Sequence, residues 1–158
     1  MKVACIAFIA AGCSTNLHIQ RSDGAWAELG HVLPGTWTAA SESGSNVTVS
    51  FRWIANASVL AETFGRPGHE TMTLYHLDHG ALMATHYCAQ GNQPRLRVAA
   101  VAPHAISLRF ADVTDRDPSE AMLVELDYEL AGDRFDRIEV YRQPDGSLER
   151  TRWHFTRA

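Results

Sequence analysis

Two histidines and a cysteine lie close together in the middle of the chain, where their side chains could bind a metal ion or act in catalysis. His76 precedes the tripeptide Asp78-His79-Gly80, and His86 and Cys88 follow it. This tripeptide predicts a three-residue hairpin loop in which the glycine adopts the left-handed conformation that a β-carbon disfavours. The hairpin would bring the three side chains onto neighbouring strands.

This expected hairpin register pairs Leu77 with Ala81 and divides the side chains between two faces. The more aliphatic face carries Met72, Leu74, His76, Leu82, Ala84, His86 and Cys88. We expect this face to point inward, with Glu70 opposite Cys88. A buried imidazole or carboxylate needs a hydrogen-bond partner. The histidines and Glu70 are therefore candidates for hydrogen bonding to the polar end of a ligand.

A metal site is one alternative use of these residues. His86 and Cys88 at i and i+2 point the same way and could ligate a soft metal with His76 or Glu70 as a third ligand. In the expected register, however, His76 and His86 are on the order of 13 Å apart along the strands, too far to share one ion. The simpler interpretation is a histidine whose hydrogen bonds are satisfied within a polar cluster.

An enzyme is the second alternative, with Cys88 as a nucleophile activated by His86. Nothing in the sequence marks an orienting third group or an oxyanion hole, and a small buried thiol explains the cysteine equally well. We therefore favour a protein that is not an enzyme. No catalytic residue, metal ligand or cofactor is assigned.

The elements that would position these residues are mostly short strands. A helix is expected over residues 17–33, with Ser22-Asp23 as its cap and Pro34-Gly35 as its stop. Ten alternating runs follow, separated by turn residues. They cover residues 36–41, 46–55, 58–65, 70–77, 81–88, 94–102, 105–111, 121–130, 134–142 and 148–156.

Each of these runs has one apolar side and one polar side. For example, Phe51 and Trp53 share a face, as do Met122 and Tyr128. A meander of ten such strands must bury its apolar side, and closure into a barrel does so while removing exposed edges. The predicted fold class is therefore all-β, an antiparallel up-and-down barrel of about ten strands with one N-terminal helix. A β-sandwich is the second choice.

The N-terminus predicts export from the cytoplasm. Residues 1–13, MKVACIAFIAAGC, combine one lysine, an apolar stretch and small residues before Cys13. This is the layout of a secretory signal, and it resembles the lipobox of bacterial lipoproteins, in which Cys13 would be lipidated. The expected division is a leader over residues 1–12 and one domain over 13–158, in the periplasm or anchored to a membrane. The alternative is a short buried element of a cytoplasmic protein.

The composition of the chain limits the kinds of molecule that the protein is expected to bind. The chain has 158 residues, of which 46% are hydrophobic and 20% charged, with a formal net charge of −4. This describes one folded globular domain. Basic and acidic residues are interspersed, so no nucleic-acid surface is predicted. Three cysteines allow no disulfide framework, and no protein partner can be inferred.

The segment Gly35-Thr36-Trp37 begins the first strand directly after the helix, and this arrangement resembles the calycin superfamily of lipocalins and fatty-acid-binding proteins. The resemblance implies that Trp37 closes the barrel floor and that an arginine of the last strand packs across it; Arg150, Arg152 and Arg157 are the candidates. Ten strands favour the fatty-acid-binding or nitrobindin-like branch. The stretch from Thr85-His86-Tyr87-Cys88 to Gly91-Asn92-Gln93-Pro94-Arg95 resembles bacterial proteins of the same general shape.

The alternation of the last strand bears on haem, because nitrobindin-like proteins use a histidine from this part of the chain. Trp153 and Phe155 are expected to point inward and His154 outward, which opposes haem ligation. Arg95 could clamp an anionic group, although Leu96 and Val98 pointing inward would turn it outward.

The resemblance implies that the protein binds a small, mostly hydrophobic molecule inside the barrel. The alternatives are a metal or haem barrel using histidines, a cysteine and histidine enzyme, and an envelope protein whose barrel is packed shut. The candidate ligand-binding residues are Phe51, Trp53, Met72, Leu74, His76, Leu82, His86, Cys88, Arg95, Met122, Tyr128 and Trp153.

Overall fold

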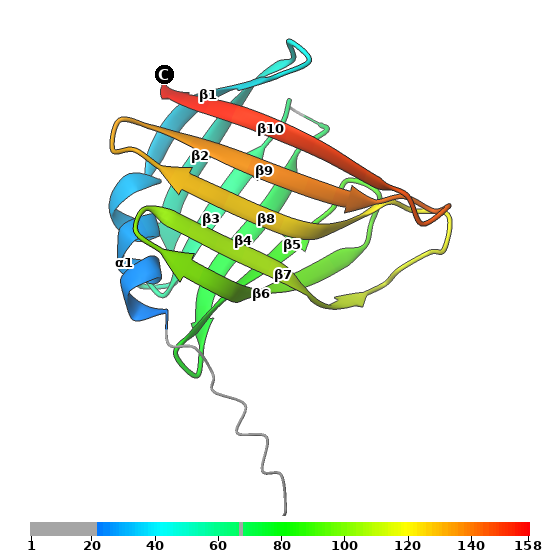
Figure 1. The fold of residues 1–158 in the computed structure, drawn as a ribbon, viewed down its shortest axis with the longest axis horizontal. Helices are drawn as coiled ribbons and strands as arrows, with labels where there is room; N and C mark the ends of the chain where they lie inside the picture. The colour runs from blue at the N-terminus through cyan, green and yellow to red at the C-terminus, as the bar shows by residue number, and fades with distance from the viewer. Residues whose placement is uncertain (1–21, 67) are drawn as a thin grey trace, which may run out of the picture.

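The computed structural model describes residues 22–66 and 68–158, which form one helix and ten strands (Figure 1). The helix, α1, covers Asp23–Val32. The strands are β1 (Gly35–Ser41), β2 (Asn46–Ile54), β3 (Val59–Phe64), β4 (Thr71–Asp78), β5 (Ala81–Tyr87), β6 (Gln93–Ala102), β7 (Ala105–Thr114), β8 (Met122–Leu130), β9 (Arg134–Arg142) and β10 (Leu148–Arg157). All ten expected runs are therefore strands.

The ten strands close into a single antiparallel barrel. Each strand pairs with the next one along the chain, and β1 pairs with β10, for example Ala39 with Phe155. Closure leaves no strand edge unpaired, which removes the need for a second sheet. The predicted up-and-down barrel is confirmed, and the sandwich alternative is wrong.

Helix α1 covers one end of the barrel (Figure 1). Its inward residues Ala25, Leu29 and Val32 are buried. Ser22 anchors the chain just before the helix, since its amide donates to Gly80 O at 2.9 Å and its hydroxyl accepts from Leu82 N at 2.9 Å. We call this end the closed end. The opposite end carries the β1–β2, β3–β4, β5–β6, β7–β8 and β9–β10 connections, and we call it the open end.

Trp37 and Arg157 pack against each other at the closed end. The Trp37 ring is fully buried, its indole nitrogen donates to Leu33 O at 2.7 Å, and the Arg157 guanidinium carbon lies 3.9 Å from the ring centroid. The guanidinium also donates to Val32 O and Pro34 O. The expected pairing of Trp37 with an arginine of the last strand is confirmed, and Arg157 is that arginine.

Most of the barrel interior near the closed end is apolar. Leu60, Phe135 and Phe155 are each 1% exposed or less. Among the described residues, no helix is long and apolar enough to cross a membrane. The leader expected over residues 1–12, Cys13 and the first residues of the expected helix lie outside the described part of the chain.

Candidate functional site in the barrel interior

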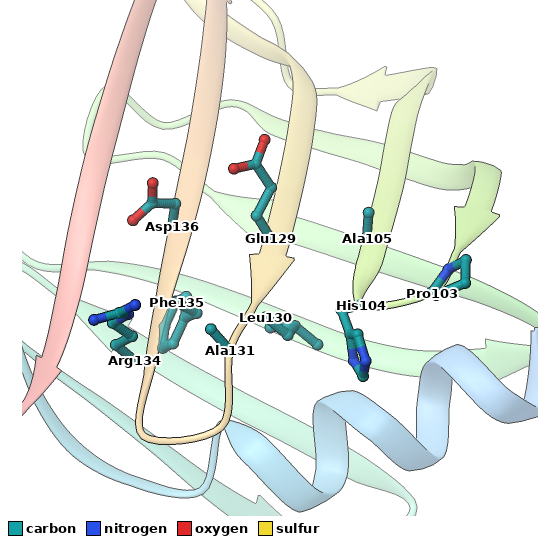
Figure 2. Close-up of a pocket in the computed structure, with 9 residues that line it drawn as sticks. All are labelled: Pro103, His104, Ala105, Glu129, Leu130, Ala131, Arg134, Phe135 and Asp136. Atoms are coloured by element: carbon teal, nitrogen blue, oxygen red, sulfur yellow. The ribbon is translucent and has the colours of Figure 1, made fainter.

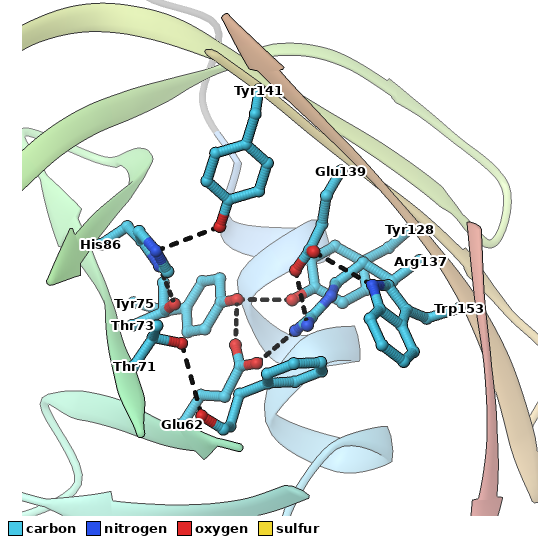
Figure 3. A network of polar contacts seen from close by, with 11 residues as sticks. Glu62, Thr71, Thr73, Tyr75, His86, Tyr128, Arg137, Glu139, Tyr141 and Trp153 are labelled. Carbon is cyan, nitrogen blue, oxygen red and sulfur yellow. Dashed lines mark hydrogen bonds and ion pairs between the residues drawn. The ribbon is translucent and has the colours of Figure 1, made fainter. Parts of the chain in front are cut away.

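A buried arginine lies at the centre of the barrel, held between two carboxylates (Figure 3). Arg137 is 2% exposed; its Nη1 donates to Oε1 of Glu62, and its Nη2 lies 2.7 Å from Oε1 of Glu139. The guanidinium carbon lies 4.8 Å from the ring centroid of Phe64 and 5.0 Å from that of Phe155. Both terminal nitrogens of Arg137 are thus engaged with acids of the protein itself.

Two tyrosines extend this arrangement. The Tyr75 hydroxyl donates to Oε2 of Glu62 at 2.7 Å, and the Tyr75 and Tyr128 hydroxyls are 2.5 Å apart. The single Tyr75 hydroxyl proton lies in the hydrogen bond to Glu62. In the contact between the two hydroxyls, Tyr128 is therefore the donor and Tyr75 the acceptor. Burial raises the pKa of both phenols, so both are neutral at ordinary pH.

Glu139 is the member of this arrangement that solvent can reach. Its side chain is 12% exposed, whereas those of Glu62 and Arg137 are 2% exposed. Its Oε2 accepts a hydrogen bond from the Trp153 indole nitrogen at 3.1 Å. Burial raises the pKa of Glu139 despite the neighbouring guanidinium. We refer to Glu62, Tyr75, Tyr128, Arg137, Glu139 and Trp153 as the interior network.

His86 makes a second set of contacts beside the interior network. Its Nδ1 lies 3.0 Å from the Thr73 hydroxyl and its Nε2 lies 3.3 Å from the Tyr141 hydroxyl. Burial, together with the charge of Arg137, lowers the pKa of His86 to about 3. The imidazole is therefore neutral, with both ring nitrogens occupied.

The strand register explains why these residues meet. Glu62, Thr73 and His86 are direct partners across β3, β4 and β5. Tyr128, Arg137 and Trp153 are direct partners across β8, β9 and β10. Each row lies on the inner face because partners in an antiparallel sheet point the same way. The Arg137–Glu62 ion pair joins the two rows across the interior.

The inward side chains nearest the open end remain partly accessible. Phe64, Thr71, Tyr141, Thr151 and Trp153 all share a face with buried interior residues, yet each is only partly buried. Solvent that reaches inward side chains of a closed barrel must come through its open end. In the interior network, Glu139 and Trp153 are the members that retain part of this exposure.

The expected hairpin register of β4 and β5 is wrong by one residue. Asp78 pairs with Ala81 across a two-residue turn, in which His79 (φ 50°) and Gly80 (φ 81°) are both left-handed. Compared with the expected three-residue loop, this turn shifts β4 by one residue against β5. Because side chains alternate along a strand, the β4 residues expected on the inner face lie on the outer face, and the reverse. Met72 is 39% exposed on the outer face, and Leu74 and His76 share that face. The interior instead holds Thr73 and Tyr75.

The predictions for β5 and for the residue after it have mixed outcomes. Leu82 and His86 are buried and inward as expected. Cys88 follows the end of β5 and is partly buried. Glu70 is exposed and accepts a hydrogen bond from Gly68 N at 2.7 Å, so it does not face Cys88 inside the barrel.

Three further candidates lie away from the interior network. Trp53 is on the same face as Phe51 but at the closed end, where it is 37% exposed and packs edge-on against Trp26 of α1 at 5.2 Å. Arg95 points outward and pairs with Asp112 at 2.5 Å. Met122 precedes a β-bulge between Leu123 and Glu125, which reverses its face relative to Tyr128.

Met122 belongs to a small apolar cluster separate from the core, formed with Val124, Ile138 and Val140. Ile138 and Val140 alternate with Arg137 and Glu139 on β9, so this cluster is on the outer side of the sheet. The prediction that Met122 faces the cavity is therefore wrong. Phe51, Tyr128, Phe155 and Trp153 point inward and His154 outward, as expected.

The histidines and the cysteine do not form the metal or catalytic groupings considered from the sequence. His76 and His86 are on opposite faces of the sheet, and within residues 22–66 and 68–158 no three histidine, cysteine or acidic side chains are arranged to hold a metal ion. His86 contacts Thr73 and Tyr141, and its low pKa makes it a weak base. It is therefore not placed to activate Cys88.

The Gly91-to-Arg95 stretch has a structural role at the open end. Asn92 is fully buried, and its Nδ2 donates to Glu120 Oε2 at 2.9 Å and to Ala121 O at 3.0 Å. Gln90 accepts a hydrogen bond from Ala121 N. These bonds fasten the β5–β6 connection to the β7–β8 connection, which shapes one side of the opening.

Sequence reasoning missed seven residues of the site: Glu62, Phe64, Thr73, Tyr75, Arg137, Glu139 and Tyr141. One signal was present, since Glu62 lies between Leu60 and Phe64 on an otherwise apolar face. On β9 both faces carry apolar residues, so alternation alone cannot decide whether Arg137 is inside.

A hollow of about 340 Å³ lies on the surface at the closed end (Figure 2). Apart from Arg134, its ionic groups are already paired. Glu129 and Asp136 bind Arg152 at 3.1 and 2.8 Å, and His104 lies 2.7 Å from Glu28 of α1. The interior network is the stronger candidate because its charges are buried.

The architecture defines a closed ten-stranded antiparallel barrel with a polar, partly accessible interior. Among solved structures, the chain is similar to the crystal structure of Rv2717c from M. tuberculosis, with a TM-score of 0.52 and 15% sequence identity over 80% of this chain and 92% of that one. This similarity concerns the fold alone. The sequence matches no protein-family model and no curated protein.

Proposed function

We propose that the protein binds a small, mostly apolar molecule in the half of the barrel interior next to the open end. The apolar part of the ligand would lie against Phe64 and Trp153, and its polar group would reach Glu139 and the Tyr141 hydroxyl. A closed barrel is a fold that could hold a ligand, and the partly accessible inward side chains support a route through the open end.

The observation that carries this proposal is the interior network itself. A buried ion pair is often no more stabilising than apolar residues of the same size, because both charges lose their hydration. Two acids, one arginine and two tyrosines in the middle of a barrel are therefore poor choices for stability alone. Polar groups at fixed positions in an otherwise apolar interior are typical of ligand sites.

One donor in the network lacks a partner. Arg137 Nε is buried and has no hydrogen-bond partner among the described residues. Buried polar atoms are nearly always satisfied, so a water molecule is the expected partner. This supports an interior that water, and hence a small ligand, can enter.

The proposal extends to family and location. The Trp37–Arg157 pair and the ten-stranded closure support membership of the calycin superfamily. The pattern of residues 1–13 supports action in the bacterial cell envelope, with attachment through lipidated Cys13.

Two indole N–H signals in a nitrogen–proton correlation spectrum test the proposal. Trp153 donates to Glu139 inside the barrel, whereas Trp37 donates to Leu33 O at the closed end and serves as an internal control. Titration with the neutral dye N-phenyl-1-naphthylamine should shift the Trp153 signal saturably and leave Trp37 unmoved. Saturable binding that leaves Trp153 unmoved would contradict the proposed site.

A matched pair of variants tests the route. Thr151→Trp places a large ring on the inner face near the open end, and Thr38→Trp places the same ring on the exposed outer face of β1. Dye binding should fall at least about tenfold in the first variant and stay unchanged in the second. Equal binding in both would show that the dye does not enter through the open end.

A further inference from the structure

The charges inside the barrel do not balance. Glu62 and Glu139 bring two negative charges and Arg137 brings one positive charge, while His86 is neutral. Tyr75, Tyr128 and Tyr141 are neutral phenols, because burial raises the pKa of each. With both acids ionised, the interior network carries one negative charge in excess.

Arg137 is not free to bind an acidic ligand. Each of its terminal nitrogens already binds a carboxylate, through Nη1 to Glu62 and Nη2 to Glu139. A ligand carboxylate or phosphate would have to displace one of these acids and bring a third negative charge into a buried space. The site is therefore unfavourable for anions.

An acid bonded to an aromatic side chain lies on the side of the network toward the open end. Glu139 is the most accessible charge of the network, at 12% side-chain exposure. Trp153 donates to it, and the Phe64 ring packs edge-on against Trp153 with centroids 5.0 Å apart. Tyr141 shares the inner face of β9 with Glu139 and is also partly accessible. Carboxylates and aromatic faces together are what binds ammonium groups.

We infer that the ligand is an organic cation, an amine or quaternary ammonium carried on an apolar body, whose charged group contacts Glu139 beside the Trp153 indole. This inference rests on the proposed function, because it names the ligand class of the same site. The raised pKa of Glu139 agrees with it, since burial leaves that carboxylate without full compensation in the free protein. A bound cation would supply the missing charge.

Three probes of equal chain length separate the possibilities on the full chain: octylammonium, 1-octanol and octanoate. The Trp153 and Trp37 indole signals report where each probe binds. We expect octylammonium to bind about tenfold more tightly than octanol, and octanoate to bind more weakly than octanol. This comparison uses the unmodified protein, so it does not depend on the folding of any variant.

A pair of variants adds the residue-level test. Glu139→Gln removes the inward charge, and Glu129→Gln removes a charge from the exposed outer face of β8. The first should reduce octylammonium affinity about tenfold and octanol affinity by a clearly smaller factor. The second should change neither.

The outcomes distinguish the two proposals. Octanoate binding as tightly as octylammonium, or octylammonium affinity unchanged in Glu139→Gln, overturns the cation inference while the binding site stands. If none of the three probes shifts the Trp153 signal, the proposed function itself fails.

Discussion

Arg137 on β9 and Glu62 on β3 form a buried ion pair across the barrel interior, between residues 75 positions apart in the chain. The pair links the inner face of three consecutive strands to that of another three. Substitutions can separate the effect of this ion pair on protein stability from its effect on ligand binding.

Arg137→Leu should destabilise the protein by about 3–5 kcal/mol, because Glu62 and Glu139 would remain buried without their counter-charge. The triple change Glu62→Leu, Arg137→Met and Glu139→Leu removes all three charges. It should leave the free energy of unfolding within about 1 kcal/mol of the original value or raise it. Urea denaturation measures both. The triple variant should also lose probe binding, and a loss of less than about 1 kcal/mol for Arg137→Leu would contradict a buried, coupled pair.

His86 should make the protein less stable as the pH falls. Its pKa is about 3 in the folded state against an ordinary value of 6.5, so the unfolded chain binds the extra proton between these values. Stability from this group is complete above pH 6.5 and is lost as the pH falls toward 3. Between pH 6.5 and 4.5 the loss should be about 2 kcal/mol.

His86→Asn should lack this loss when the free energy of unfolding is measured at both pH values. Glu139 acts in the opposite direction, because its raised folded pKa favours the folded state as the pH falls toward its ordinary value. That contribution is common to both proteins and cancels in the comparison. An equal pH dependence in His86→Asn would show that the imidazole is not buried in its neutral form.

Two glycines should respond to alanine with opposite signs. Gly35 has φ +129°, and a β-carbon there would clash with Nη1 of Arg157, so Gly35→Ala should cost about 1–3 kcal/mol. Gly24 lies in α1, and a β-carbon at this position would meet no atom within 4 Å, so Gly24→Ala should stabilise the protein by up to about 1 kcal/mol. Thermal unfolding measures both, and a stabilising Gly35→Ala would contradict the described closed end.

Asn92→Ala should cost about 2 kcal/mol, because it removes two hydrogen bonds from a buried group that joins two connections at the open end. Gln143→Ala is the control, since it removes one exposed hydrogen bond to Glu149 and should change stability by less than about 0.5 kcal/mol. Denaturant unfolding compares them. Similar values for both would mean that Asn92 does not fasten the opening.

The strands, their order and the closure could be predicted from the sequence because alternation and turn residues repeat ten times. The inner face of β4 could not, since the shape of one turn decides it. His79 takes a left-handed conformation that asparagine or glycine would have signalled more clearly. A one-residue difference in that turn moved Tyr75 inside and Met72 outside.

The charged residues at the centre of the site could not be predicted from the sequence for a related reason. Ile138 and Val140 are buried on the outer side of β9, which makes its two faces equally apolar in the sequence. The β-bulge at Leu123 then reverses the phase of Met122. Pattern reasoning works where one face is wet and the other dry, and β8 and β9 depart from that rule at the site.

Ser22 fixes where the preceding chain joins the barrel, since it is bonded to Gly80 and Leu82 at the closed end. Whatever precedes Ser22 therefore joins the barrel at the end opposite its opening, so the point of attachment does not obstruct the route to the interior network.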